Sequence, residues 1–209
     1  MVKIQRLFAK TNLKIPVYWE VAENEKSGLT ELFENNRRKQ LFMLYLKSAN
    51  LEDIEKEYEF ITNTPSNENG FTNFASGCSR KEFEIKILPG YINAEKGIDL
   101  ADGWVPETDF FLWDDEKIVG LFRVRHYLTP ALANGGGHIG YGIKKEFRGK
   151  GYASEGLRLT IEKAWHIIKE DEIYMSVHRD NTASLRVQIK NGAYIHHQDE
   201  KEFYTRIKR

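Results

Sequence analysis

The 209-residue sequence has one cysteine, Cys78, which is too few for an internal disulfide or a cysteine-rich zinc site. A lone thiol is compatible with a reducing compartment. No apolar run approaches the roughly 20 residues that a membrane span needs, and the N-terminus leads into no apolar signal segment. These absences predict a cytoplasmic protein that works without a metal and without a membrane.

The sequence also lacks an excess of charge of either sign, because Lys+Arg number 31 and Asp+Glu number 31. A protein that binds duplex nucleic acid usually carries a basic excess, so nucleic acid is not an expected partner. With 41% hydrophobic and 30% charged residues, the composition is that of a soluble globular protein. We expect one domain over residues 41–209 and an extension of uncertain structure over residues 1–40.

The hydrophobic pattern indicates an α+β protein. Residues 63–80 are rich in Asn, Ser, Gly and Thr and are expected to form a loop. Pro89 and Gly90 are expected to interrupt any long element after that loop. Helices are expected over 51–61, over about 153–169 and from Asn181 to a glycine stop at Gly192. Strands are expected at 41–47, 110–113, 118–127, 138–143, 173–177, 193–197 and 202–207.

The most informative segment is the basic turn between the expected strand 138–143 and the expected helix that follows it. Helix N-termini carry unpaired N–H groups and a positive dipole end, so they bind phosphate. Gly149 and Gly151 would let a phosphate approach the backbone. Five cations lie nearby: Lys144, Lys145, Arg148, Lys150 and Arg158. The segment therefore predicts a phosphate or pyrophosphate site, with a tight turn under a solvated basic face as the alternative reading.

Residues Arg148-x-x-Gly151-x-Ala153 match the signature Q/R-x-x-G-x-G/A, and Asn181-x-x-Ser184 and Asn191-Gly192-Ala193 follow it. In these motifs the sequence resembles the GNAT superfamily of N-acetyltransferases, over roughly residues 41–209. The resemblance implies a three-layer α/β/α fold. Its central sheet would be mixed, mostly antiparallel, and splayed between strands four and five.

The resemblance further implies that acetyl-CoA is the cosubstrate and that no metal takes part. The pantetheine arm would lie between the splayed strands, and the pyrophosphate would lie on the turn and the helix start. Asn181 would reach the pantetheine or the phosphates, with a plain helix cap as its alternative role. The expected contact residues are Tyr141, Gly142, Ile143, Arg148, Gly149, Lys150, Gly151, Tyr152, Ala153, Ser154, Asn181 and Ser184.

Direct acyl transfer needs a base, because an alkyl amine with a pKa near ~10 is mostly protonated at neutral pH. His138 lies ten residues before Arg148, a spacing at which members of the family hold a catalytic Glu or His. His138 is therefore the expected base and His126 the second candidate, while a structural role on the strand is the alternative for His138. The position at which the family often has an acidic Tyr is Gln188, which leaves the general acid open.

We therefore expect an N-acetyltransferase that moves an acetyl group from acetyl-CoA directly to an amine, as a monomer or homodimer. The acceptor is a small molecule or peptide amine and is not identified by the sequence. It would face an N-terminal helix, the 63–80 loop and the segment around Trp104. One alternative is a catalytically weak or inert acyl-CoA-binding module that acts as a sensor or partner-docking domain. A nucleotide enzyme with a phosphate loop is a further alternative.

Overall fold

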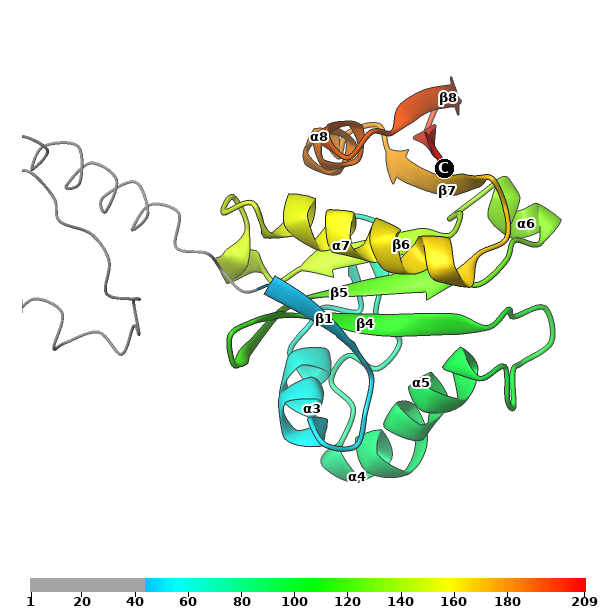
Figure 1. Cartoon of the computed structure of the whole chain (residues 1–209). Helices are drawn as coiled ribbons and strands as arrows, with labels where there is room; N and C mark the ends of the chain where they lie inside the picture. The colour runs from blue at the N-terminus through cyan, green and yellow to red at the C-terminus, as the bar shows by residue number, and fades with distance from the viewer. Residues whose placement is uncertain (1–43) are drawn as a thin grey trace, which may run out of the picture. The chain divides into compact units, whose positions relative to one another are not determined.

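The computed structural model describes residues 44–209 (Figure 1), so the predicted extension over residues 1–40 lies outside the described residues. A four-stranded antiparallel sheet has the order β1-β4-β5-β6. A three-stranded antiparallel sheet has the order β7-β9-β8. The strands are β1 (Leu44–Ser48), β4 (Glu107–Asp114), β5 (Lys117–Arg125), β6 (Ile139–Ile143), β7 (Glu172–His178), β8 (Tyr194–Gln198) and β9 (Glu202–Lys208).

Helices cover both faces of the four-stranded sheet and make three layers (Figure 1). One face carries α7 (Tyr152–Ile167), with α8 (Thr182–Lys190) beside it. The other face carries α3 (Ile54–Thr62) and α5 (Leu88–Glu95). Shorter elements are α4 (Arg80–Glu82), the π-helical turn η2 (Phe83–Ile87), α6 (Pro130–Ala133) and the 3-10 turn η3 (Lys145–Phe147). The predicted α+β class is confirmed, including the gap between the fourth and fifth major strands, β6 and β7.

Alternation along the central strands divides the core into two halves. Phe110 and Leu112 of β4 pack in the cluster that contains α7, whereas Phe111 and Trp113 pack in the cluster that contains α3. Successive side chains of a strand point to opposite faces, so an apolar run such as this one needs cover on both sides. Both faces of the central sheet are therefore covered by helices.

The 63–80 segment is not only a loop. It contains a small hairpin of β2 (Asn67–Glu68) and β3 (Phe71–Thr72), called here the β2–β3 hairpin. Asn69 and Gly70 form its turn with φ of 53° and 87°. Asn-Gly is the favoured pair for a turn that needs two positive φ angles, so this dipeptide was a local signal for the hairpin.

The interruption expected at Pro89 is also absent, because α4, η2 and α5 follow one another directly from Arg80 to Glu95. Pro89 lies in the first turn of α5, immediately after the π-helical turn. A proline lacks an N–H donor and clashes with the carbonyl four residues earlier in a regular α-helix. A π-helical turn changes that register, which allows the helical path to continue through the proline.

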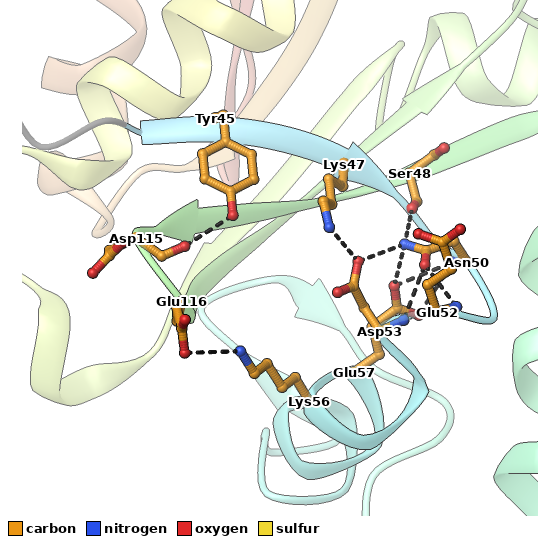
Figure 2. A network of polar contacts seen from close by, with 10 residues as sticks. All are labelled: Tyr45, Lys47, Ser48, Asn50, Glu52, Asp53, Lys56, Glu57, Asp115 and Glu116. Atoms are coloured by element: carbon orange, nitrogen blue, oxygen red, sulfur yellow. Dashed lines mark hydrogen bonds and ion pairs between the residues drawn. The ribbon is translucent and has the colours of Figure 1, made fainter.

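Figure 2 shows a polar network around the buried Glu57 at the start of α3. Glu57 is fully buried and accepts hydrogen bonds from the backbone N and the side-chain Nδ2 of Asn50, both at 3.1 Å. Lys47 and Asp53 form an adjoining ion pair at 2.7 Å. Burial raises the pKa of Glu57 to about 8, although the hydrogen bond from Asn50 favours its charged form. The network ties β1 to α3 through a carboxyl group that is neutral at pH 7.

Glu57 gives a pH-dependent prediction for stability. Between pH 4.5, the reference pKa of glutamate, and about 8, the folded chain keeps a proton that the unfolded chain releases. The unfolding free energy should therefore fall as pH rises through this window, by up to about 1.4 kcal/mol per pH unit. Glu57→Gln replaces the ionisable carboxyl group by an amide, so this contribution to the pH dependence of stability is lost. Denaturant unfolding at pH 5 to 9 should thus give a shallower decline for the variant than for the wild type.

The exposed Glu59→Gln serves as the matched control on the same helix, and it should keep the wild-type slope. Parallel pH dependences for the wild type and Glu57→Gln would contradict the assignment of a buried, protonated Glu57.

Candidate functional site

A short contact joins β6 and β7 at one end, and we call it the Gly137 clasp. The N–H of His138 donates to the carbonyl of Tyr174 at 2.7 Å, and Gly137 forms an isolated bridge with Met175. A Cβ on Gly137 would lie 2.2 Å from the Tyr174 carbonyl oxygen, so this approach requires glycine. Arg125 of the neighbouring strand β5 donates from its Nη1 to the Gly137 carbonyl at 3.0 Å. Beyond the clasp the two strands belong to separate sheets.

A central groove of about 610 Å³ lies between the two sheets. Its walls include β6, the turn after β6, the start of α7, the end of β7 and α8. Apart from Lys150, every residue that the sequence predicts to contact the cosubstrate lines this groove. Those residues are Tyr141, Gly142, Ile143, Arg148, Gly149, Gly151, Tyr152, Ala153, Ser154, Asn181 and Ser184. The exposed Lys150 places its ammonium 5.5 Å from the Phe147 ring.

Helix α7 begins inside the groove. Gly151 is its N-cap, with a left-handed φ of 89° and no side-chain acceptor for the first N–H groups. A left-handed cap suits glycine, and the first four N–H groups of a helix have no partner within the helix. No heavy atom lies within 4 Å of the position that a Cβ of Gly149 or Gly151 would occupy, apart from their immediate surroundings along the chain. The helix end therefore offers accessible backbone donors.

The charges around this helix end are only partly those expected from the sequence. Arg148 donates to the Ile143 carbonyl at 2.9 Å and forms an ion pair with Glu68 of the β2–β3 hairpin. Arg158 is paired with carboxylates on its own helix and does not line the groove. Arg186 and Lys190 of α8 do line it, and the sequence analysis missed them. The two residues are four positions apart, so they lie on one face of α8, and the sequence carries no separate sign that this face meets the groove.

The β2–β3 hairpin contacts both walls of the groove. Phe71 lies against β6, since a Cβ on Gly142 would be 3.1 Å from its ring. On the other wall the Asn181 Nδ2 lies 3.5 Å from the carbonyl of Asn69. Further along, Phe74 lines the groove and its ring contacts that of Trp104 at 6.1 Å. Parts of the 63–80 segment and the Trp104 segment thus meet beside the groove, where the sequence analysis expected an acceptor.

Tyr141 and Ser184 meet across the groove from β6 and α8. The Tyr141 hydroxyl lies 2.6 Å from the Ser184 Oγ and 3.2 Å from the Ser184 carbonyl. Burial raises the pKa of Tyr141 to about 12, so its hydroxyl stays protonated at neutral pH. Asn181 accepts from the Ser184 N–H at 3.1 Å, which makes it the N-cap of α8. The side-chain NH₂ group of Asn181 takes no part in this cap.

Neither predicted base lines the groove. His138 is fully buried, its Nδ1 accepts from the Tyr174 N–H at 3.0 Å, and its Nε2 lies 3.4 Å from a Glu170 carboxylate oxygen. His126 places Nε2 2.9 Å from the Thr108 hydroxyl. Burial lowers the pKa of both imidazoles, opposed in His138 by Glu170. These contacts give His138 a structural role in the clasp, and its role as a base stays a prediction.

Gln188 occupies the position at which the sequence analysis looked for an acid. Its side chain is buried and its Oε1 accepts from the Thr205 hydroxyl at 2.8 Å. An amide in this arrangement joins α8 to β9 and supplies no proton. Gln188 thus makes a structural contact at this position, and the identity of the general acid stays open.

A buried ionic cluster lies at the clasp end of the groove. Arg123 contacts Asp109 at 3.0 Å and Glu107 at 3.2 Å, and Arg125 contacts Glu107 at 3.8 Å. Both arginines line the groove. Burial raises the pKa of Glu107, and Arg123 opposes that rise. The carboxylates balance the arginines, so this wall is polar but close to neutral.

Residues 44–209 contain no group of three or more His, Cys, Asp and Glu side chains suited to holding a metal ion. No helix in this part of the chain is long and apolar enough to span a bilayer.

The sequence matches a known domain family. A family model described as "Acetyltransferase (GNAT) domain" matches residues 31–194. Over 82 residues the chain is 32% identical to "Probable N-acetyltransferase YjcK" of Bacillus subtilis (strain 168). That stretch covers 39% of this chain and 44% of the relative, so the match spans less than half of the relative's length.

Solved structures share the fold. One is RimL, a ribosomal L7/L12 alpha-N-protein acetyltransferase in complex with coenzyme A, at a TM-score of 0.56 and 16% identity. The structural match covers 78% of this chain and 92% of the RimL chain. Another is spermidine N-acetyltransferase from Vibrio cholerae in complex with CoA and spermine, at a TM-score of 0.53 and 15% identity. The structural match covers 79% of this chain and 95% of the spermidine N-acetyltransferase chain. At these identities the likeness concerns the fold.

The clasp gives a prediction about stability. In Gly137→Ala the new Cβ would collide with the Tyr174 carbonyl and would also sit at a φ of 66°. The expected loss of unfolding free energy is about 3 kcal/mol or more, from backbone strain plus overpacking. Denaturant unfolding measures it. Gly103→Ala is the matched control, because Gly103 has a φ of 80° and open space around it.

The control should lose only about 1 kcal/mol, from the left-handed backbone alone. Equal losses in the two variants would show that the close approach at Gly137 contributes nothing.

Proposed function

Because the chain belongs to the GNAT acetyltransferase domain family, we propose that it transfers an acetyl group from acetyl-CoA directly to an amine. The observation that carries the proposal is the central groove, which runs between separated strands to the N-terminus of α7, where the N-cap residue is Gly151. We further propose that the catalytic domain spans residues 41–209. The two solved structures named above are complexes with coenzyme A, and their names give different amines, so they do not select one acceptor for this chain.

The groove fits the parts of acetyl-CoA. At the α7 end, the N–H groups after Gly151 suit a pyrophosphate, and Arg186 and Lys190 add positive charge to the same groove. In the middle, β6 pairs with β5 along one edge only. Within residues 44–209, no strand pairs with its other edge beyond the clasp. Free backbone groups on that edge can form hydrogen bonds with an amide-bearing arm such as pantetheine.

The chain's own groups supply three functions in this proposal. The start of α7 would bind and neutralise phosphate charge. Backbone N–H groups of β6 near Ile139–Tyr141 would stabilise the oxyanion formed during attack on the thioester. The hairpin and the ring of Phe74 would keep bulk water from the reacting end of the groove. The acetyl donor supplies the activated acyl group, and the acceptor supplies the nucleophilic nitrogen.

Cosubstrate binding can be tested at a single glycine. In Gly151→Trp, the large side chain should obstruct the helix N-terminus and lower acetyl-CoA affinity by about tenfold or more, which corresponds to ~1.4 kcal/mol. Isothermal titration calorimetry with acetyl-CoA measures this. Gly192→Trp is the control, since Gly192 has nearly the same φ, 88° against 89°, has open space and does not line the groove.

The control should bind acetyl-CoA as the wild type does. Wild-type affinity in a folded Gly151→Trp would refute the proposed phosphate site. Turnover is measured separately as release of free thiol from acetyl-CoA with spermine, a peptide with a free α-amino group, and an amino-sugar antibiotic. Tight binding of acetyl-CoA without thiol release with any of these amines would favour a binding module over an enzyme.

A further inference from the structure

His178 is the histidine that faces the central groove. All six histidines lie within residues 44–209, and His178 alone among them lines the groove. His138 and His126 are held by the contacts described above. Of the others, His166 lies in the last turn of α7, and His196 and His197 contact each other on β8. An imidazole in the groove was not predicted from the sequence, which gave His138 and His126 as the candidate bases.

The side chain of His178 points away from the α7 layer. On β7 the side chains of Ile173, Met175 and Val177 are buried, the first two within the α7 cluster. Alternation along a strand puts Ser176 and His178 on the opposite face, and both line the groove. This is the face that carries the β2–β3 hairpin, because the turn of that hairpin lies against the His178 ring.

Glu202 accompanies His178 from the neighbouring strand. The two residues are register partners on β7 and β9, and a Glu202 carboxylate oxygen lies 3.7 Å from the His178 Nδ1. Both side chains line the groove. At this distance the carboxylate acts through its charge, since a direct hydrogen bond would be shorter. A carboxylate on the Nδ1 side stabilises an imidazolium and leaves Nε2 as the nitrogen that exchanges protons.

Gly70 lies against the ring edge that carries the second nitrogen, Nε2. A Cβ on Gly70 would lie 2.9 Å from the His178 Nε2 and 2.9 Å from its Cδ2. The residue has a φ of 87° in the Asn69–Gly70 turn, where an alanine would be strained as well as crowded. The hairpin therefore approaches the ring edge closely without a side chain that would cover Nε2.

From these contacts we propose that His178, oriented by Glu202, is the general base that takes the proton from the acceptor amine. The inference rests on the proposed acetyl transfer and names a catalytic residue for it. Nε2 accepts one proton from the ammonium form of the acceptor, which becomes the neutral nucleophile. The nitrogen attacks the thioester carbonyl, a C–N bond forms, the C–S bond breaks, and coenzyme A leaves as a thiolate. The amide nitrogen loses its second proton, and the thiolate and solvent take up the protons released.

Other charged groups of the groove wall set the field around His178. They belong to the hairpin, β5, the turn after β6, α8 and β9, and they are Glu68, Arg123, Arg125, Arg148, Arg186, Lys190 and Glu202. Glu68 and Arg148 neutralise each other as an ion pair. Glu202 is thus the carboxylate left to balance an imidazolium at His178.

The test compares single-residue variants of the full chain in two assays, calorimetric binding of acetyl-CoA and thiol release with spermine, a peptide and an amino-sugar antibiotic. His178→Ala should bind acetyl-CoA normally and lose about 100-fold in kcat, the usual scale for a lost base. The rising limb of the kcat pH profile should disappear, and added imidazole should restore part of the rate. Glu202→Gln should retain binding and lower kcat, because the imidazole loses the carboxylate beside its Nδ1. His196→Ala, an exposed histidine outside the groove, should behave as the wild type.

Gly70→Ala covers Nε2 without removing the imidazole, so it should lower kcat while leaving acetyl-CoA affinity intact. Unchanged kcat and an unchanged pH profile in His178→Ala would overturn the proposal. So would a result in which His138→Ala loses the rising limb of the kcat pH profile and His178→Ala keeps it. Absence of thiol release by the wild type with every acceptor would overturn acetyl transfer itself and this inference with it. Absence of acetyl-CoA binding by the wild type, measured separately in the calorimeter, would overturn the proposed cosubstrate and this inference with it.

Discussion

The site depends on the Gly137 clasp, where the backbone of residues 137–138 contacts β7. Two hydrogen bonds link His138 to Tyr174, one through the main chain and one through the imidazole. The approach is possible because Gly137 has no Cβ. Beyond this point β6 and β7 diverge, and each remains supported by its own sheet. One short contact therefore fixes the closed end of a groove whose open end is the start of α7.

The groove has two chemically different ends because two kinds of element meet around it. At one end, the N-terminus of α7 presents backbone donors, with cations from α8 along the same wall. The β2–β3 hairpin contacts both walls, through Arg148 on one side and Asn181 on the other. At the opposite end lie the balanced ionic cluster around Arg123 and the aromatic ring of Phe74. Phosphate recognition and acceptor recognition are thus assigned to separate surfaces in the proposed reaction.

The sequence predicted the seven strands of the two larger sheets, α7 and α8 well, because apolar periodicity and the glycine stop after α8 are local properties. The residues around Gly151 could also be assigned to one site, since strand, turn and helix adjoin along the chain. His138 and His178 show the limit of this reasoning. Both are strand histidines, and only the tertiary contacts reveal that one is enclosed by Tyr174 and Glu170 while the other lines the groove. The helical path through Pro89 likewise needed the preceding π-helical turn.

The central claim is that acetyl-CoA occupies the groove between β6 and the start of α8. Backbone amide hydrogen exchange with and without saturating acetyl-CoA tests it directly, because it reports on each segment without requiring an acceptor. Slower exchange is expected over residues 139–143 and 149–154 in the complex, with little change over β1 and α3. Binding that leaves exchange in both groove segments unaltered, or that protects another surface instead, would contradict it.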